Sequence, residues 1–261
     1  IRQSYLARRA LTFRPASRMM KPPPSADIAE LIAAARTQGH EVLSEPESKA
    51  FLRAIGIPIP PSYVVTSAAA AAEAAETIGC PVVIKAVSRA LTHKTDAGGI
   101  VFPIKTPAAA VTACDLIAER VRRARPDVVL DGFLIEAFQP AKLEWILSLK
   151  IDPQFGPYIM FGLGGIFVEL LGQVSFRLAP LSEMDIDSLL ADKLVARALE
   201  GIRGDQPANR ESLKAAIRAL SDLGARSDIA AEIAEIEINP LIVTERGVLA
   251  LDALILLRSR S

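Results

Sequence analysis

The stretch PVVIKAVSRALTHKTDAGGIVFPI, residues 81–104, carries the clearest information on fold and function. Its first part, Pro81–Val87, is apolar except at Lys85, which predicts a strand buried on both faces in a sheet. Residues 100–104 predict a second short strand. The polar segment between the two predicted strands connects them and contains a pair of glycines.

Lys85 is unusual because it interrupts an otherwise apolar strand. Desolvating an unpaired charge costs several kcal/mol, so the ammonium group needs either water or a partner. One interpretation is a lysine at the strand end whose stem is buried while its ammonium group reaches solvent. The other is a lysine aimed at a phosphate group of a ligand.

The connecting segment is suited to an anion. Gly98 and Gly99 allow the backbone to approach phosphate oxygens closely and to expose N–H groups. His93 lies beside Lys94 and close to Asp96. A lone histidine in a loop is usually just solvated, but this setting also fits a nucleophile or phosphoryl acceptor.

A second glycine cluster occupies residues 162–165 and is followed by Glu169. It is either a tight turn between strands or another phosphate-facing backbone segment, with Glu169 near a metal ion. It is not a Walker motif, because no Gly-Lys-Ser/Thr follows, and it lacks the spacing of a dinucleotide fingerprint.

A C-terminal hairpin contains the third candidate group. If Glu245 and Arg246 form its two-residue loop, Asn239 and Asp252 face each other on one side of the sheet. An amide oxygen beside a carboxylate suits Mg²⁺, which prefers oxygen ligands and often keeps waters and substrate phosphates. A bulge at Gly247 would shift this register by one residue. The alternative is an Asn-Pro turn followed by a strand-end aspartate.

The rest of the chain predicts a mixture of strands and helices. Further strands are predicted at residues 133–138, 145–151, 158–161, 175–179, 235–243 and 248–254. Helices are predicted around residues 28–35, 44–56, 66–79, 106–121, 182–192 and 208–223. The capping box of Ser44 and Glu47 and the Thr106-Pro107 pair mark two helix starts. The mixture indicates an α/β or α+β class with two lobes.

Composition excludes several classes of protein. The chain has 261 residues, with 30 lysines and arginines balanced by 30 acidic residues. Neutrality argues against a nucleic acid partner, because neutralising phosphates needs a basic excess. No apolar stretch reaches the roughly 20 residues of a membrane span. The two cysteines, Cys80 and Cys114, are too few for a disulfide framework and indicate a reducing compartment, so a cytoplasmic location is expected.

The first 26 residues differ from the rest, since they carry basic side chains and no acid. An organelle-type presequence is one interpretation. A linker or leader is favoured, and residues 1–26 are therefore left out of the core fold, which is placed in residues 27–261.

Several short motifs occur together in a fixed order: PVVIK (81–85), HKTDAGG (93–99), DPQFGP (152–157), MFGLGG (160–165), SFRLAPL (175–181) and EINPL (237–241). This series resembles the ATP-grasp (β) part of ADP-forming acyl-CoA synthetases, relatives of succinyl-CoA synthetase, and spans residues 27–256. The resemblance implies an ATP-grasp fold in which two lobes, expected at residues 27–135 and 136–261, clamp a nucleotide.

The resemblance also implies a reaction, acyl-CoA + ADP + phosphate ⇌ acid + ATP + CoA, with ATP or ADP and Mg²⁺ bound. His93 matches a phosphoryl-carrying histidine of the family. A CoA-binding unit is missing from this sequence, so a CoA-binding (α) subunit or fused domain is the expected partner.

Site residues follow from the same motif matches. The residues expected to bind the nucleotide are Lys85, Lys94, Gly98, Gly99, Glu136, Ala137, Phe138 and Glu144. The residues expected to face the phosphates are Gly164, Gly165 and Arg177, and the expected metal ligands are Asn239, Asp252 and Glu169.

The sequence departs from the family pattern at two positions. Leu143 stands where a glycine-rich stretch is common, and Ile151 stands where arginine is common. Both side chains are expected to narrow or remodel the nucleotide side of the site, which bears on nucleotide affinity more than on fold.

Two other functions stay open. One is a non-catalytic, nucleotide-sensing ATP-grasp module of a larger regulatory protein, such as an acetyltransferase fusion. The other is an ATP-grasp carboxylate–amine ligase, which passes phosphoryl straight to its carboxylate and needs no histidine. The presence of His93 beside the lysine and metal motifs favours the synthetase. The acid used and the choice between ADP and GDP are not indicated.

Overall fold

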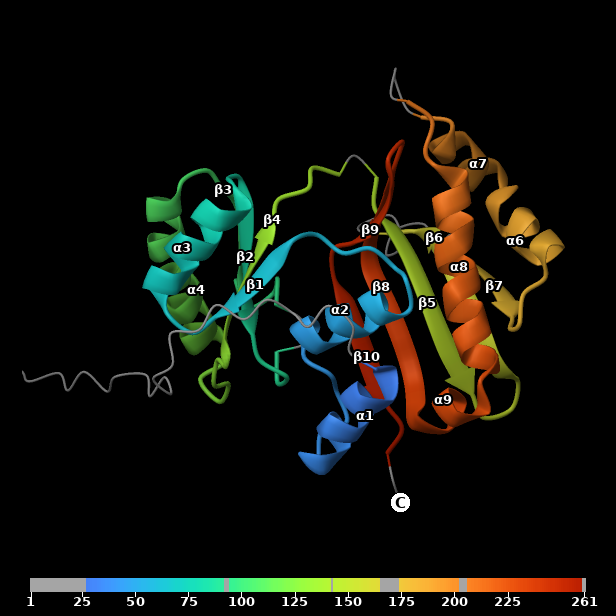
Figure 1. Cartoon of the computed structure of the whole chain (residues 1–261), viewed down its shortest axis with the longest axis horizontal. Coiled ribbons are helices and arrows are strands. Elements are labelled where there is room, and N and C mark those ends of the chain that lie inside the picture. Colours follow the sequence, from blue (N-terminus) through green and yellow to red (C-terminus); the bar gives the residue numbers. More distant parts are fainter. Residues whose placement is uncertain (1–26, 92–93, 142, 165–173, 202–205, 260–261) are drawn as a thin grey trace, which may run out of the picture.

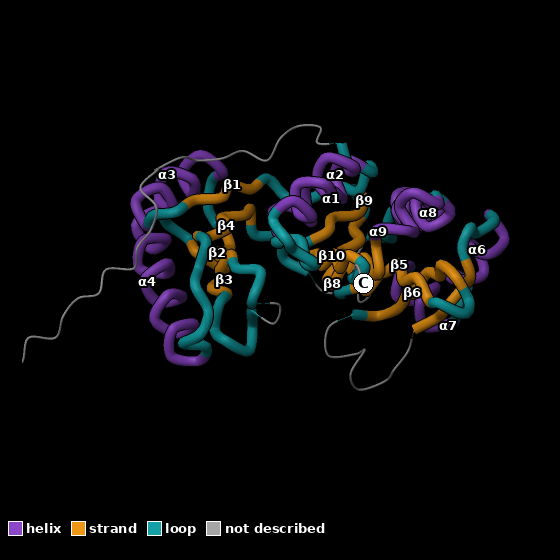
Figure 2. The backbone as a smooth tube through the Cα atoms, turned by 90° about the horizontal axis from the view of Figure 1, so that it is seen from below, coloured by secondary structure: helices purple, strands orange, loops and turns teal. Residues whose placement is uncertain are grey.

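The computed structural model describes residues 27–91, 94–141, 143–164, 174–201 and 206–259. In this part of the chain the elements form two lobes side by side, each with its own antiparallel sheet and apolar core (Figures 1 and 2). The mixture of helices and strands and the two lobes predicted from the sequence are confirmed. No helix within these ranges is long and apolar enough to cross a membrane.

The smaller lobe is a sheet covered by two helices. Its strands run in the order β1-β4-β2-β3, with bounds Ser62–Val65 for β1, Gly132–Ala137 for β4, Val82–Val87 for β2 and Ile100–Ile104 for β3. Helices α3 (Ala68–Ile78) and α4 (Pro107–Ala124) pack on one face (Figure 1). Their starts follow from capping, because Ser67 and Thr106 each accept a hydrogen bond from the backbone three residues on.

The larger lobe is built on a sheet with the strand order β10-β8-β5-β6-β7, and β9 also pairs with β8. The bounds are Trp145–Asp152 (β5), Gly156–Leu163 (β6), Val174–Leu178 (β7), Ile233–Thr244 (β8), Gly247–Ala250 (β9) and Ala253–Leu257 (β10). The helices that follow β7 are Glu183–Leu190 (α6), Lys193–Leu199 (α7), Arg210–Ala225 (α8) and Ser227–Glu232 (α9). Helices α7 and α9 and strand β1 were not predicted.

The first two helices pack on the larger lobe, although they come first in the chain. Helices α1 (Ile28–Thr37) and α2 (Glu45–Ala54) lie over the same sheet face as α8 (Figure 2). Phe51 and Leu52 of α2 are fully buried in the core that contains β5, β8 and β10. The expected lobe of residues 27–135 therefore needs correction, since the chain crosses between lobes after α2. An amphipathic helix shows that it needs a partner surface but not which sheet provides it.

The C-terminal hairpin has the predicted register. Thr244 pairs directly with Gly247, so there is no bulge at that glycine. The predicted strand 248–254 is in fact two strands, β9 and β10, which pair in turn with the long β8. The break falls at Asp252, whose carbonyl accepts a hydrogen bond of 3.3 Å from the backbone N–H of Asn239. The two candidate metal ligands are thus held side by side.

Candidate active site

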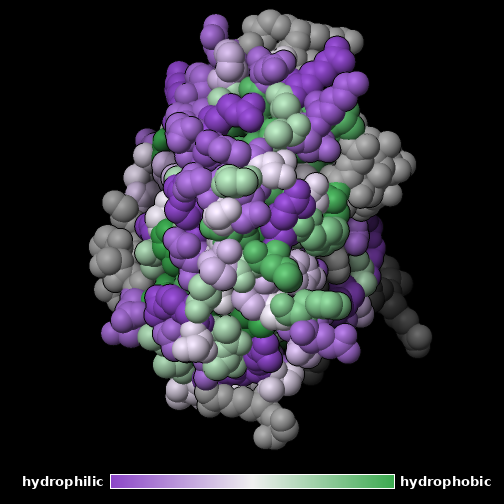
Figure 3. Space-filling view, turned by 90° about the vertical axis from the view of Figure 1, so that its right-hand side faces the viewer, coloured by the Kyte–Doolittle hydropathy of each residue, from purple (hydrophilic) through white to green (hydrophobic). Residues whose placement is uncertain are grey.

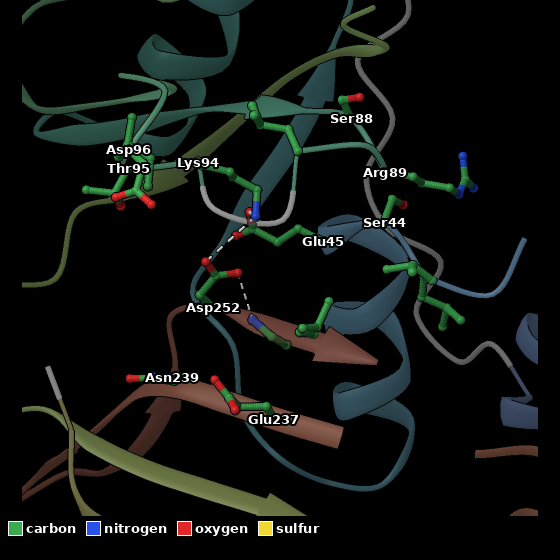
Figure 4. Close-up of a pocket in the computed structure, with 16 residues that line it drawn as sticks. Ser44, Glu45, Ser88, Arg89, Lys94, Thr95, Asp96, Glu237, Asn239 and Asp252 are labelled. Carbon is green, nitrogen blue, oxygen red and sulfur yellow. Dashed lines mark hydrogen bonds and ion pairs between the residues drawn. The ribbon is translucent and has the colours of Figure 1, made fainter. Parts of the chain in front are cut away.

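Two neighbouring cavities meet at Asn239 and Asp252. The first has a volume of about 510 Å³ and is lined from the smaller lobe by β2, β3 and β4 and from the larger lobe by β8 and the β9–β10 break. The second has a volume of about 390 Å³ and is lined by the start of α2 and by the loop after β2 (Figure 4). Both cavities also share Thr95 and Ile100. The site therefore lies where the two lobes face each other.

One wall of the first cavity is aromatic. The rings of Phe102 and Phe138 stack with their centroids 5.7 Å apart, and Phe102 is largely exposed. Such a pair offers a flat apolar surface to a planar ring. The predicted residues Glu136, Ala137, Phe138 and Glu144 all line this cavity. The backbone N–H groups of Ala137 and Phe138 are engaged by the carbonyls of Pro61 and Pro81, each at 3.0 Å.

Lys85 is buried among oxygens. Its Nζ donates to Glu45 Oε1 at 2.7 Å and to the carbonyl of Leu251 at 2.6 Å, and Glu136 Oε1 lies 3.5 Å away. Burial alone would lower the pKa of Lys85, but the carboxylates of Glu45 and Glu136 raise it well above the usual value. Lys85 therefore stays charged, and its burial excludes a lysine whose ammonium group reaches solvent. Lys85 lines the first cavity, but its donors face protein oxygens.

The contacts of Lys85 extend into a group of charged side chains, called here the interlobe ion cluster: Glu45, Lys49, Lys85, Lys94, Glu136 and Asp252. Its three lysines balance its three carboxylates. Removing one member of such a buried network leaves an uncompensated charge. Sequence reasoning missed Glu45 and Lys49. The available signal was an acid and a lysine four residues apart on an apolar helix face beside Phe51 and Leu52.

Glu45 is the centre of this cluster. Its side chain is 1% exposed, and it contacts lysines 49, 85 and 94. Burial would raise the pKa of Glu45, but these three lysines hold it far below the ordinary value. Lys94 Nζ lies 3.1 Å from Glu45 Oε2 and 3.8 Å from Asp252 Oδ2, so it stands between the two carboxylates (Figure 4).

The glycine pair closes the loop and does not present donors to an anion. The N–H of Gly98 donates to the carbonyl of Thr95 at 3.0 Å, and the N–H of Gly99 donates to that of Lys94 at 2.7 Å. Gly98 has a φ of +67°, and a Cβ there would lie 2.9 Å from the Arg120 side chain. The expectation that this pair offers two N–H groups to phosphate is therefore corrected.

Asn239 and Asp252 form an open pair of oxygen ligands. Among the described residues, no group of three or more His, Cys, Asp or Glu side chains could hold a metal ion. Burial raises the pKa of Asp252, and the nearby Glu45 carboxylate raises it further. A cation at Asp252 would relieve that cost. The amide and the carboxylate fit a hard ion such as Mg²⁺ that takes its remaining ligands from water and phosphate.

Glu237 lies beside this pair on β8 and also lines the second cavity (Figure 4). Burial and the neighbouring Glu235 carboxylate raise its pKa above the ordinary value. Its position on the wall of the second cavity adds a polar group to the site.

Two of the predicted phosphate-facing residues are not brought to the cavities. Gly164 donates to the carbonyl of Glu144 at 2.7 Å, and a Cβ there would lie 2.8 Å from the Trp145 backbone, so its role is close packing. Arg177 lies on the outer strand β7 and donates to Ser188 Oγ at 2.9 Å. His93, Gly165 and Glu169, together with residues 1–26, lie outside the described residues.

The side of the molecule that is on the right in Figure 1 is mostly hydrophilic, with separate apolar patches (Figure 3). Strand β7 contributes exposed Phe176 and Leu178 on the sheet face opposite Arg177. Arg177 borders a separate cavity of about 330 Å³ together with these two residues. The strand predicted at residues 175–179 is therefore present, but Arg177 does not line either of the two cavities that meet at Asn239 and Asp252.

The fold and this site define an ATP-grasp protein. The family model of the ATP-grasp domain matches residues 34–257, and the chain belongs to that family. It is 39% identical over 228 residues to the β subunit of ADP-forming acetate–CoA ligase I of Pyrococcus furiosus, covering 87% of this chain and 97% of that subunit.

Solved structures agree with this assignment. One is acetyl-coenzyme A synthetase 1 of Ca. Korarchaeum cryptofilum in complex with coenzyme A, Ca-AMPCP and HgCl+. It is 38% identical with a TM-score of 0.84, covering 89% of this chain and 100% of that chain. A second structure of that synthetase contains coenzyme A and Mg-AMPPCP, with a phosphohistidine segment that points towards the nucleotide binding site. It is 36% identical with a TM-score of 0.74, covering 88% of this chain and 99% of that chain.

Proposed function

We propose that this chain is the nucleotide-binding, phosphoryl-transferring part of an ADP-forming acyl-CoA synthetase. The reaction is acyl-CoA + ADP + phosphate ⇌ acid + ATP + CoA. The observation that carries the proposal is the site itself. An aromatic-walled cavity between two lobes ends at Asn239 and Asp252, in a chain that covers 97% of a β subunit named for this activity.

The first cavity is assigned to the nucleotide. The base lies against Phe102 and Phe138, where a planar ring gains apolar contact and stacking. The phosphates extend towards Asn239 and Asp252, close to Lys85 and Lys94. Asn239 and Asp252 would hold Mg²⁺, which would neutralise charge on the phosphate oxygens.

The second cavity is assigned to the approach of phosphoryl. His93 is the predicted carrier, because a histidine intermediate splits one long transfer into two short ones. The partner is a CoA-binding α subunit or a fused domain. The β-subunit name of the Pyrococcus relative and the coenzyme A in the Korarchaeum complexes support such a partner.

The test uses the full chain with and without its candidate partner. The chain alone is expected to bind ADP but to make no ATP from acyl-CoA, ADP and phosphate. Addition of a CoA-binding α subunit is expected to start ATP formation, followed with luciferase. Asp252→Asn with the same partner is the matched control and is expected to lose most of that rate. Robust ATP synthesis by the chain alone would overturn the need for a partner.

A further inference from the structure

The carboxylate of Glu45 makes contacts that the assignment of the nucleotide cavity leaves unexplained. Its Oε1 lies 2.7 Å from Lys85 Nζ, and its Oε2 lies 3.1 Å from Lys94 Nζ. One buried carboxylate therefore holds both lysines that the sequence motifs relate to phosphate. Lys94 has no other anionic contact within 3.5 Å among the ion pairs of the described residues, since Asp252 lies 3.8 Å away.

Glu45 belongs to the larger lobe, and it binds two lysines that belong to the smaller lobe. Glu45 stands in the first turn of α2, which is anchored in the larger lobe through Phe51 and Leu52. Lys85 is on β2 and Lys94 is in the following loop, both of the smaller lobe. Lys85 borders the first cavity, whereas Glu45 borders the second. The ammonium groups thus point towards α2, and the carbonyl of Leu251 takes another donor of Lys85.

A phosphate group offers these lysines what Glu45 now supplies: negative charge and oxygen acceptors at hydrogen-bond distance. An ammonium group has only three donors. The Lys85 donors face Glu45, Leu251 and Glu136, so a phosphate must replace one of these oxygens to reach the ammonium group. Nucleotide binding and the Glu45 contacts therefore compete for the same donors.

We infer that Glu45 is a resident competitor of the nucleotide phosphates, a positioning residue that holds Lys85 and Lys94 through its own carboxylate and lowers nucleotide affinity. This inference rests on the proposed function of the same site. A competing role and a supporting role of Glu45 predict opposite changes in nucleotide affinity when Glu45 is replaced. If Glu45 only kept the lysines in a productive orientation, its loss would weaken nucleotide binding. If it competes, its loss strengthens binding.

The test compares Glu45→Gln with the wild-type chain by calorimetry in EDTA, using ADP and adenosine as probes. Glu45→Gln is expected to bind ADP about tenfold more tightly, because two charged donors are released to the phosphates. Adenosine carries no phosphate, and its affinity is expected to stay unchanged. Glu232→Gln, which removes an equal charge from the pair with Arg36 at a position that does not line either cavity of the site, is the matched control and is expected to change neither affinity.

Glu45→Gln leaves an excess of buried positive charge, so a second variant protects the test against misfolding. Glu45→Gln/Lys49→Met removes one charge of each sign, keeps the interlobe ion cluster neutral and still frees Lys85 and Lys94. It is also expected to bind ADP more tightly than the wild type. Equal or weaker ADP binding by the folded variants overturns the inference alone. A wild-type chain that binds no ADP overturns the proposed function together with it.

Discussion

Glu45 keeps its charge inside the protein because three lysines surround it, and this makes its contribution to stability depend on pH. The lysines hold its pKa far below the ordinary value of 4.5. A carboxyl group with a lowered folded-state pKa stabilises the fold above its unfolded pKa, and that stabilisation is lost as the pH falls. We expect the free energy of unfolding at neutral pH to be about 3–5 kcal/mol lower in Glu45→Gln than in the wild type.

That difference is expected to shrink as the pH falls below 4.5, because only the wild-type carboxylate takes up a proton on unfolding in this range. Urea unfolding of both proteins at a series of pH values from neutral to acid measures it. Asp252, whose pKa is raised by burial and by Glu45, acts in the opposite direction, and measuring both proteins in an Asp252→Asn background removes its contribution. If the difference in free energy of unfolding stays constant with pH, the charge of Glu45 does not stabilise the folded protein.

Asp252 and Asn239 are expected to make the nucleotide affinity of the site depend on Mg²⁺. Asp252→Asn and Asn239→Ala are each expected to weaken Mg·ADP binding by about tenfold, because the first removes the charge of an oxygen ligand and the second removes the ligand oxygen itself. ADP in EDTA is the internal control and is expected to bind no more weakly than to the wild type. Calorimetric titration with and without Mg²⁺ separates the two effects. Unchanged Mg·ADP affinity in both variants would make the pair a structural feature of the strand break.

His93 is expected to carry phosphoryl without gripping the nucleotide. His93→Ala should abolish ATP formation by the chain with its partner and leave ADP affinity close to that of the wild type. A luciferase assay gives the first value and calorimetry gives the second. Near-normal turnover of the variant would exclude a relay through this histidine.

At the scale of elements, the packing of the chain after β6 against the start of β5 depends on Gly164. A Cβ there would lie 2.8 Å from the Trp145 carbonyl carbon and 3.0 Å from its oxygen. Gly164→Ala is therefore expected to lower the free energy of unfolding by about 1–3 kcal/mol, because backbone atoms give way poorly. Urea unfolding measures this, and the ADP affinity of the folded variant is expected to stay within about twofold. Unchanged stability with weakened ADP binding would restore a phosphate-facing role.

Elements whose signals are local could be predicted from the sequence, and elements defined by distant partners could not. The hairpin register followed from the loop at Glu245-Arg246, because turn length fixes which residues face each other. The starts of α2 and α4 followed from their capping residues. Strand β1 has four residues and depends on its pairing with β4, which no local pattern shows.

The same limit explains the site. Asn239 and Asp252 could be predicted because one hairpin holds both. Lys85 was recognised as a residue that needs a partner, but Glu45 lies 40 positions earlier on an element of the other lobe. A contact of this kind depends on where α2 packs relative to the smaller lobe, and a pattern in one segment carries no information on that packing.

At the scale of the whole molecule, the neutral composition hides a strongly charged interior. The interlobe ion cluster joins α2 of the larger lobe to β2 and β4 of the smaller lobe through buried contacts. The lobes are thus coupled electrostatically in addition to their two chain crossings. Ligands that rearrange these contacts act on both lobes at once, which makes the cluster a place where binding and lobe arrangement meet.

The return of α1 and α2 to the larger lobe makes the smaller lobe an insertion in the chain. The segment from β1 to β4 forms the smaller lobe, and the chain before and after this cassette belongs to the larger lobe. Its two ends are neighbours, because Ser62 pairs with Glu136 and Ala137 donates to the carbonyl of Pro61 at 3.0 Å. Entry and exit therefore form a single double-stranded joint. Such a joint allows the cassette to be lengthened, exchanged or grafted as one piece, because the path of the chain through the larger lobe stays the same.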